Sequence, residues 1–323
     1  MPTAITGDEL VLRLTTDGPS MAGLVVVDDL PDAASAPDWP AATQRLATMP
    51  CVVVGGAGWG GADSAGLELV DARADDVALQ AIAATLALAP LASTALALHL
   101  RGVAGRTMGE GLVAESAVYS ALQAGPEFAA WRRATPVRLR PPTARPAVAV
   151  ERKGDQLVVE LDRPEVRNAL GVQMRDELLD ALAVAEADPA LQVTLRGRGP
   201  SFCAGGDLDE FGRAPDPATA HLIRLDRSIG AVLARLADRV TVELHGACLG
   251  SGIELPAFAG RIVAHPDTTF GLPELGLGLI PGAGGTVSLP ARIGRHRTAL
   301  LALTRQPIDA PTALRWGLVD ALG

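Results

Sequence analysis

Two segments, HGACLGSGIE at residues 245–254 and FGLPELGLGLIPGAGG at residues 270–285, each join a glutamate to a glycine-rich turn. The glutamates are Glu254 and Glu274, and their neighbours are Leu, Ile, Phe and Gly with few other charges. Carboxylates are rarely buried unless they are paired. A pair in an apolar pocket suits general acid–base catalysis, because burial raises carboxyl pKa values toward neutrality. We therefore predict that Glu254 and Glu274 are the catalytic pair of an active site.

Three glycine-containing turns surround this pair in the sequence. PSFCAGGD at residues 200–207 follows a predicted strand, Gly250 to Gly252 opens a predicted helix near Ile253, and GAGG occupies residues 282–285. Turns and helix N-termini expose unpaired N–H donors, and two such donors can hold one oxygen that gains negative charge during a reaction. The turns therefore predict an oxyanion site beside the glutamates.

Each of these residues also has a simpler explanation. Glu254 alone fits a carboxylate at a helix N-terminus, Glu274 fits a solvated loop residue, and Asp207 fits a turn or cap. The nearby histidines and cysteines suit structural roles: His245, His265, Cys203 and Cys248. The ordered combination, and no single member, favours a functional site.

Alternating strand and helix patterns predict an α/β domain in the C-terminal part of the chain. Its predicted strands are residues 156–161, 191–195, 239–244 and 261–264, with helical spacing at 168–186 and 217–238. The N-terminal part shows helical periodicity at 75–97 and 108–134, short strands at 10–14, 24–27 and 51–54, and a glycine-rich loop at 55–65. The proline-rich stretch RLRPPTARP at 138–146 predicts a linker between the two parts.

The composition indicates a globular protein with a large core. The 323 residues are 48% hydrophobic and carry a formal net charge of −9, which argues against nucleic acid as the main partner. Three cysteines without metal-ligand spacing argue against disulfides and zinc. The polar N-terminus does not resemble a signal peptide, and the apolar tract around 80–98 is broken by polar residues and proline. We expect a buried helix pair there, no membrane partner and a cytoplasmic location.

The joint pattern resembles the crotonase (enoyl-CoA hydratase/isomerase) superfamily. The matching segments, in the family's order and spacing over residues 147–323, are RPEVRNAL (163–170), SFCAGGDL (201–208), HGACLGSGIE (245–254), FGLPE (270–274), GLIPGAGGT (278–286) and ALRWGLVD (313–320). The resemblance implies an α/β spiral of ββα repeats, with a helical segment that packs over the active site or builds the oligomer. It also implies an acyl-CoA ligand and a homo-oligomer, either a trimer or a hexamer.

Site residues follow from the resemblance by position. The oxyanion hole falls on the backbone N–H groups of Gly206 and Ser251, and the two catalytic glutamates of hydratases fall on Glu254 and Glu274. The implied substrate-binding residues are Val166, Asn168, Ala169, Ala204, Asp207, Leu208, Gly250 and Pro273. By this analogy, Glu254 removes a proton from water as it attacks C3, and Glu274 supplies a proton at C2. No metal or separate cofactor is implied, because coenzyme A is part of the substrate.

The order of the segments departs from the family. Members continue for some tens of residues past the Gly-Leu-Val-Asp motif, whereas this chain stops at Gly323. GLELVDARADDVA at 66–78 and the helical patterns after it resemble that missing tail. We therefore expect a permuted crotonase with a degenerate crotonase-like remnant at 1–65, a helical segment at 66–137 and a catalytic core at 147–323. The alternative is an unrelated helical N-terminal domain.

The presence of both glutamates favours hydration of a 2-enoyl-CoA thioester. Another crotonase reaction, such as isomerisation or C–C bond cleavage, is the alternative within enzymes. A catalytically silent acyl-CoA-binding protein is the alternative in another class.

Overall fold

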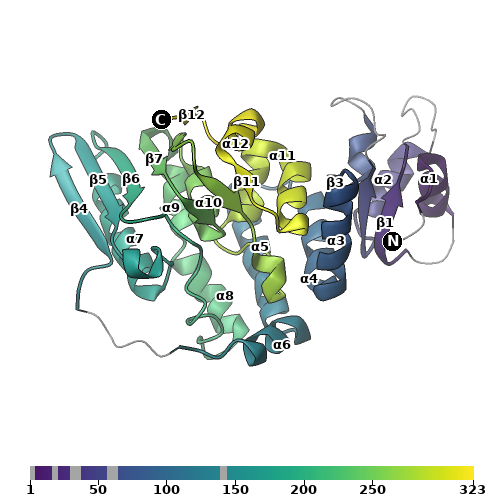
Figure 1. Ribbon diagram of the computed structural model, residues 1–323, viewed down its shortest axis with the longest axis horizontal. Coiled ribbons are helices and arrows are strands. Elements are labelled where there is room, and N and C mark those ends of the chain that lie inside the picture. The colour runs from purple at the N-terminus through teal and green to yellow at the C-terminus, as the bar shows by residue number, and fades with distance from the viewer. Residues whose placement is uncertain (1–3, 17–20, 30–37, 57–64, 139–143) are drawn as a thin grey trace.

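The computed structural model describes residues 4–16, 21–29, 38–56, 65–138 and 144–323 (Figure 1). Most of the predicted glycine-rich loop at 55–65 and of the linker at 138–146 therefore lies outside the described residues. The core is a six-stranded sheet in the order β12-β9-β7-β6-β5-β4. Its strands are β4 (Val148–Lys153), β5 (Gln156–Leu161), β6 (Gln192–Gly197), β7 (Val240–Leu244), β9 (Arg261–Ala264) and β12 (Ala321–Leu322). Only the β4–β5 pairing in this sheet is antiparallel.

A second, three-stranded sheet is followed by the segments that contain Glu254 and Glu274. It consists of β8 (Ala247–Leu249), β10 (Thr269–Gly271) and β11 (Ile308–Asp309), with β10 between the other two. Strand β8 runs directly into the short helix α10 (Ser251–Glu254), and β10 runs into the 3-10 turn η6 (Glu274–Leu277). Because β8 and β10 are parallel neighbours, the residues that follow their carboxyl ends are brought together.

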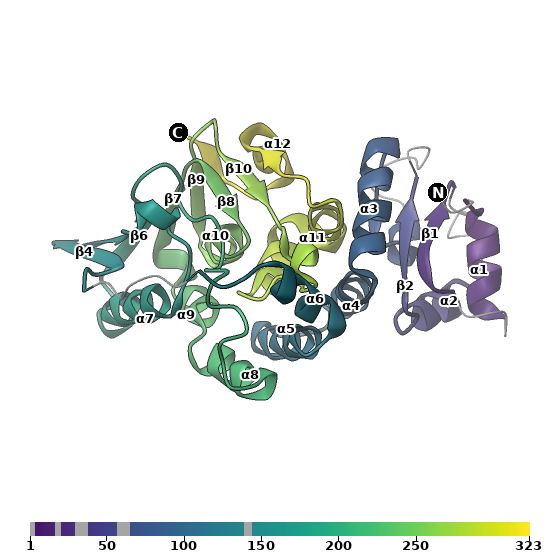
Figure 2. The same cartoon turned by 60° about the horizontal axis from the view of Figure 1, so that its bottom comes forward.

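Helices from both parts of the chain enclose one hydrophobic core. The core part supplies α7 (Val172–Ala187), α8 (Pro217–Asp226), α9 (Ile229–Arg235), α11 (Gly285–Thr304) and α12 (Ala310–Trp316). The N-terminal part supplies α3 (Asp76–Leu88), α4 (Pro90–Arg101), α5 (Met108–Gln123) and α6 (Pro126–Ala134). Helices α3, α4 and α5 pack against α11, and α5 also packs against α8 (Figure 2). One continuous cluster of buried side chains includes residues from both parts.

Three predicted helical stretches are each broken in two. Residues 217–238 form α8 and α9, because Ser228 caps a new helix by accepting from the Ala231 N–H. The junctions at Pro90 and Pro126 separate α3 from α4 and α5 from α6, since proline cannot continue a preceding helix. Among the described residues no single helix meets the length and apolarity needed to cross a membrane, whereas α3 and α4 meet them jointly but bend by 115°.

The helix expected at 168–186 starts later, at Val172. Arg167 and Asn168 have positive φ angles of 53° and 54°, which a right-handed helix does not allow. The residues before Val172 instead form a loop that lies against the Gly205–Asp207 turn, with the Leu170 N–H donating to the Gly205 carbonyl at 2.8 Å.

The N-terminal end of the chain forms a separate small unit with its own core. A parallel sheet of β1 (Gly23–Val27), β2 (Cys51–Gly55) and β3 (Ala72–Arg73) is accompanied by α1 (Gly7–Thr15) and α2 (Trp39–Leu46). The predicted strand at 10–14 is wrong, because these residues lie inside α1. Thr6 caps this helix, and Leu10, Val11 and Leu14 are buried along one side.

The sequence LVDA occurs twice, at residues 69–72 and 318–321, and makes the same backbone contacts in both places. The Asp71 N–H donates to the Val53 carbonyl at 2.7 Å, and the Val53 N–H donates to the Asp71 carboxylate at 2.8 Å. In the core sheet, the Asp320 N–H donates to the Ile262 carbonyl at 2.9 Å, and the Ile262 N–H donates to the Asp320 carboxylate at 2.6 Å. Each aspartate thereby fixes a short edge strand to its neighbour.

An arginine completes each arrangement, and we call the two pairs the Arg–Asp clamps. Arg101 of α4 approaches Asp71 to 2.6 Å and also donates to the carbonyls of Leu46, Met49 and Cys51. Arg292 of α11 approaches Asp320 to 3.3 Å and donates to the carbonyls of Ala257 and Ala259. The second LVDA segment thus has a structural counterpart in the N-terminal sheet.

Candidate active site

A cavity of about 650 Å³ is lined by helices α5, α7, α8 and α10, by Glu274 and by the loops at residues 206–214 and 282–283. This volume is within the range of small-molecule sites. Five of the residues predicted from the sequence line it: Gly206, Asp207, Ser251, Glu254 and Glu274. Helix α5 of the N-terminal part contributes Tyr119 and Gln123 to the same wall. The cavity is therefore built from both parts of the chain.

The two predicted oxyanion donors come from turns that touch. The Leu249 N–H donates to the Cys203 carbonyl at 3.2 Å, which joins the 200–207 turn to the end of β8. At Gly252, a Cβ atom would lie 2.0 Å from the Cys203 carbonyl oxygen, so only glycine allows this approach. The N–H groups of Gly206 and Ser251 donate to no described residue. Both are free to bind a ligand oxygen at the cavity wall.

Serine at position 251 is compatible with this geometry. The positive φ angle in the turn falls on Gly250, at 50°, and Ser251 is the first residue of α10. A Cβ atom on Gly250 would lie 2.3 Å from the Glu274 carboxylate, so glycine is required there by space as well as by backbone conformation. The turn therefore sets the position of Glu274 as well as that of the Ser251 N–H.

Glu254 is buried and held at one oxygen. Its Oε2 accepts the N–H groups of Ala283 at 2.7 Å and Gly285 at 3.0 Å. Burial, with Glu274 and Glu115 close by, raises the pKa of Glu254 well above its ordinary value, while the two N–H donors oppose the rise. Its other oxygen is left for chemistry in the cavity.

Glu274 is buried with fewer partners. Its Oε2 has no hydrogen-bond partner among the described residues, although it is shielded from the solvent. Burial raises the pKa of Glu274 to about 8, so its protonated form predominates at neutral pH. A carboxyl group in this state can donate a proton, and its unpaired oxygen marks a place for a water molecule or ligand.

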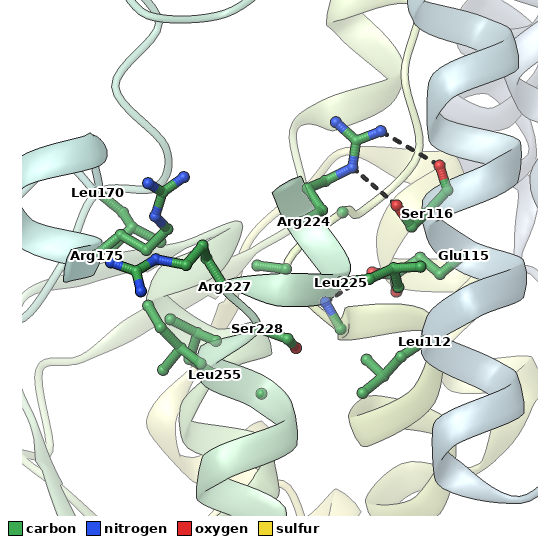
Figure 3. Close-up of a pocket in the computed structure, with 15 residues that line it drawn as sticks. Leu112, Glu115, Ser116, Leu170, Arg175, Arg224, Leu225, Arg227, Ser228 and Leu255 are labelled. Atoms are coloured by element: carbon green, nitrogen blue, oxygen red, sulfur yellow. Dashed lines mark hydrogen bonds between the residues drawn. The ribbon is translucent and has the colours of Figure 1, made fainter. Parts of the chain in front are cut away.

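A third buried carboxylate, Glu115 on α5, was missed as a site residue. It accepts the N–H group of Gly284 at 2.7 Å (Figure 3). It also accepts the N–H group of Thr286 at 2.8 Å and the Thr286 hydroxyl. The four N–H groups of residues 283–286 thus donate alternately to Glu254 and Glu115. Burial raises the pKa of Glu115 to about 7. The only local signal in the sequence was a carboxylate on the buried face of a helix.

The remaining predicted substrate-binding residues do not line the cavity: Val166, Asn168, Ala169, Ala204, Leu208, Gly250 and Pro273. Asn168 is fully buried, and its amide group donates to the carbonyls of Arg198, Ser201 and Phe202. Its Oδ1 accepts the Arg163 N–H. The Asn168 side chain therefore holds two loops together and does not face a ligand.

Groups that could hold a metal ion are not evident. Within the described ranges, no cluster of three or more His, Cys, Asp or Glu side chains has the arrangement of a metal site. The two cysteines near the turns are buried thiols, and burial raises the pKa of Cys203 to about 11. The chemistry available to the cavity is therefore carried by its carboxyl groups and backbone donors.

The fold and these turns define a crotonase-type α/β protein, and comparison with known proteins agrees. The family model described as enoyl-CoA hydratase/isomerase matches residues 151–322, more than half of the chain. The chain belongs to this family.

Curated relatives match the C-terminal half. A putative enoyl-CoA hydratase/isomerase, YhaR, of Bacillus subtilis is 36% identical over 163 residues, which are 50% of this chain and 63% of the relative. The 2,3-dehydroadipyl-CoA hydratase of Escherichia coli is 33% identical over 53% of this chain and 67% of its own length. The chain thus spans about two thirds of the length of the curated relatives it matches.

Solved structures match over a similar range. An enoyl-CoA hydratase from Thermoplasma volcanium has a TM-score of 0.51 at 34% identity, covering 55% of this chain and 72% of the other. A putative enoyl-CoA hydratase/isomerase from Mycobacterium abscessus has a TM-score of 0.51 at 37% identity, covering 55% and 70%. These likenesses establish the crotonase fold of the core.

Proposed function

We propose that this protein is an enoyl-CoA hydratase, which adds water reversibly across the double bond of a 2-enoyl-CoA thioester. The observation that carries the proposal is the meeting of two buried carboxyl groups, Glu254 and Glu274, with two unpaired backbone N–H groups in one cavity. Acid–base chemistry beside a polarised carbonyl requires these elements and no others.

The backbone donors would activate the substrate. The N–H groups of Gly206 and Ser251 would both donate to the thioester oxygen and stabilise the enolate-like charge that develops on it. Removing one such donor typically lowers the rate by ~10²–10³. Because the donors are backbone groups, side-chain substitution at position 251 would affect them only through the backbone conformation.

The two glutamates would divide the proton transfers. Two backbone N–H groups favour the charged form of Glu254, whereas Glu274 lacks such donors at Oε2. Close carboxyl groups do not both ionise readily, and burial raises the pKa of each. We assign the negative charge to Glu254, whose Oε2 accepts two backbone N–H groups, and the proton to Glu274. Glu254 then removes a proton from the attacking water, and Glu274 supplies the proton at C2.

The reaction so described uses no metal and no cofactor besides the coenzyme A that the substrate carries. We also propose an acyl-CoA thioester as the ligand, with no nucleic acid or membrane partner, a cytoplasmic location and a homo-oligomeric state, either trimer or hexamer, by analogy with the family.

We further propose that α3 to α6 take the place of the helices that follow the Gly-Leu-Val-Asp motif in other members. Support comes from the two LVDA segments, which make the same clamp contacts while α3 to α6 follow only the first, and from the packing of α5 over the cavity. On this proposal residues 66–137 complete the core at 147–323, and residues 1–65 are a remnant without a second site.

Turnover of 2-butenoyl-CoA, followed by the loss of enoyl-thioester absorbance, tests the proposed reaction. Glu254→Gln and Glu274→Gln should each lower kcat by about 10²–10⁴ while coenzyme A thioesters still bind. Glu243→Gln, on an exposed position of β7, is the matched control and should keep the wild-type rate. Wild-type turnover in either glutamine variant would reject the assignment.

Product identification separates hydration from the alternatives. A 3-hydroxyacyl-CoA product supports the hydratase, whereas a shifted double bond or a shortened acyl chain identifies an isomerase or a C–C lyase. Binding of the thioester without any product over a panel of acyl chains would identify a catalytically silent acyl-CoA-binding protein.

A further inference from the structure

Arg224 of α8 lines the cavity that holds the two glutamates, and it also lines a smaller adjoining cavity of about 130 Å³. Leu170, Arg175, Gly282 and Ala283 are shared by both cavities as well. The smaller cavity therefore extends the larger one on the side where α8 faces α5. No step of the proposed hydration uses Arg224.

The guanidinium group of Arg224 has only neutral partners. Its Nε donates to the Ser116 hydroxyl at 3.1 Å, and its Nη2 donates to the Ser116 carbonyl at 3.3 Å and to the Ser120 hydroxyl (Figure 3). Its Nη1 donates to no residue in the described part of the chain, and Arg224 forms no ion pair there. Burial lowers the pKa of Arg224, which reflects the cost of a charge without a counter-ion.

The other arginines of the two cavities differ from Arg224. Arg175 and Arg227 both contact Asp176, at 2.9 and 3.2 Å, and lie together on the opposite side of the smaller cavity (Figure 3). Arg213 is exposed at the rim of the larger cavity. Of these arginines, only Arg224 is half-buried on the cavity wall and forms no ion pair with a carboxylate of the described residues.

The groups around Arg224 give its guanidinium no ion-pair partner among the described residues. The Tyr119 ring lies 4.6 Å from the guanidinium carbon, and His221 Nδ1 shares the Ser116 hydroxyl at 2.9 Å. The charge of Glu115 acts on Arg224, but Glu115 forms no ion pair with it and its oxygens accept the 284 and 286 backbone N–H groups. A ligand that reaches this wall therefore meets a positive charge whose Nη1 donors are not used by any described residue.

Arg224 and Tyr119 line the same cavity as the glutamates and the two N–H donors. The Tyr119 ring packs against Gly282, where a Cβ atom would lie 2.4 Å away, and lies 4.6 Å from the Arg224 guanidinium carbon. An acyl chain that extends along this wall from a thioester bound at Gly206 and Ser251 would reach Arg224.

We propose that Arg224 binds a second carboxylate at the far end of the acyl chain, so that the preferred substrates are 2-enoyl-CoA thioesters of dicarboxylic acids. The Nη1 group, which has no partner among the described residues, can donate to a carboxylate, and such a charge-assisted hydrogen bond is stronger than one between neutral groups. This inference rests on the proposed function for the enoyl-CoA thioester. The terminal carboxylate of the substrate is inferred from Arg224 alone.

Two six-carbon substrates that differ only in the terminal group test the proposal: 2-hexenoyl-CoA and 2,3-dehydroadipyl-CoA. The wild type should show a kcat/KM at least about tenfold higher for the dicarboxylic substrate, as expected for a charge-assisted hydrogen bond. Arg224→Leu and Arg224→Gln should lower the ratio of the two kcat/KM values by about 10- to 100-fold. Arg227→Leu, which removes a paired arginine of the smaller cavity, should leave the ratio at its wild-type value.

Damage to the fold cannot mimic this result, because it lowers both kcat/KM values and leaves their ratio unchanged. Equal kcat/KM values in the wild type, or an unchanged ratio in both Arg224 variants, would overturn the proposal.

If no substrate is hydrated, the proposed function fails but the subsite is still tested. Calorimetric affinities for adipyl-CoA and hexanoyl-CoA then replace the rates. Tighter binding of adipyl-CoA that disappears in Arg224→Gln supports the subsite, and equal affinities reject it.

Discussion

The N-terminal sheet and the core sheet share the structure of one edge, but only the core contributes the glycine turns and glutamates of the candidate site. Each has an LVDA segment, a short edge strand and an Arg–Asp clamp. Only the core also has the glycine turns and the glutamates of the cavity. The clamp is therefore a structural device that fixes an edge strand, and the proposed chemistry depends on the turns and glutamates of the core.

The two clamps also differ in solvent exposure. The Arg101 and Asp71 side chains are 4% and 1% exposed, whereas those of Arg292 and Asp320 are 15% and 36% exposed. A buried ion pair is destabilised strongly when one partner is removed, because the remaining charge has no water to solvate it. An exposed pair contributes little. Stability should therefore depend much more on the N-terminal clamp.

Asp71→Ala should have the largest effect on stability, a loss of about 3–5 kcal/mol in the free energy of unfolding, because Arg101 stays buried without its counter-charge. Urea denaturation measures it. The double variant Asp71→Ala with Arg101→Met should recover part of the loss, since it also removes the stranded charge. A loss below about 1 kcal/mol for the single variant would refute the distinction between the clamps.

Glu115→Gln extends the comparison of the two clamps to a buried carboxylate that has no ion pair among the described residues. Like Asp71, Glu115 accepts backbone N–H groups, but it forms no ion pair with an arginine there. The variant places an NH₂ group opposite one of the N–H donors of Gly284 or Thr286, which should lower the free energy of unfolding by about 1–3 kcal/mol. Denaturation against the Glu243→Gln control measures the effect.

The difference in the free energy of unfolding between the wild type and Glu115→Gln should depend on pH. Folding raises the pKa of Glu115 from its ordinary value to about 7, so the folded state holds an extra proton between those two values. Its contribution to stability is complete below the unfolded pKa and declines as the pH rises through 7. The gap between wild type and Glu115→Gln should therefore narrow from pH 5 to pH 8, and a widening gap would contradict the assignment.

Asp320→Ala should lower the free energy of unfolding by about 1–2 kcal/mol. It removes the acceptor for the Ile262 N–H, but Arg292 keeps its bonds to the carbonyls of Ala257 and Ala259 and has water nearby. The same denaturation series measures it. A cost as large as that of Asp71→Ala would mean that exposure is not what separates the two clamps.

Arg297→Ala should have the smallest effect, below about 1 kcal/mol. Its side chain makes one exposed hydrogen bond to the Trp316 carbonyl, at 3.2 Å, and stacks on that ring at 5.6 Å. Arg295 on the same helix is the matched comparison, because it is buried and donates to the carbonyls of Leu67, Glu68 and Val70. Equal thermal midpoints for the two alanine variants would contradict this ranking.

Local patterns predicted most of the core, because strand and helix periodicity there matches burial on one side. These patterns gave wrong predictions where a short segment is compatible with more than one structure or role. Residues 10–14 contain enough β-branched and apolar residues for a strand, yet Thr6 and the acidic first turn favour the helix that forms. Asn168 was expected at the substrate path, but it is needed to join two loops through three carbonyls.

The sequence by itself determined the family and the pairing of Glu254 with Glu274, because glycines at sterically closed positions and carboxyls in apolar surroundings are local properties that the residue types record. Only the tertiary structure decided that Glu115 shares a backbone loop with Glu254 and that Arg224 forms no ion pair with any of the described residues. These facts depend on contacts between α5 and residues more than a hundred positions away, and no local pattern specifies which charges become neighbours when such surfaces pack.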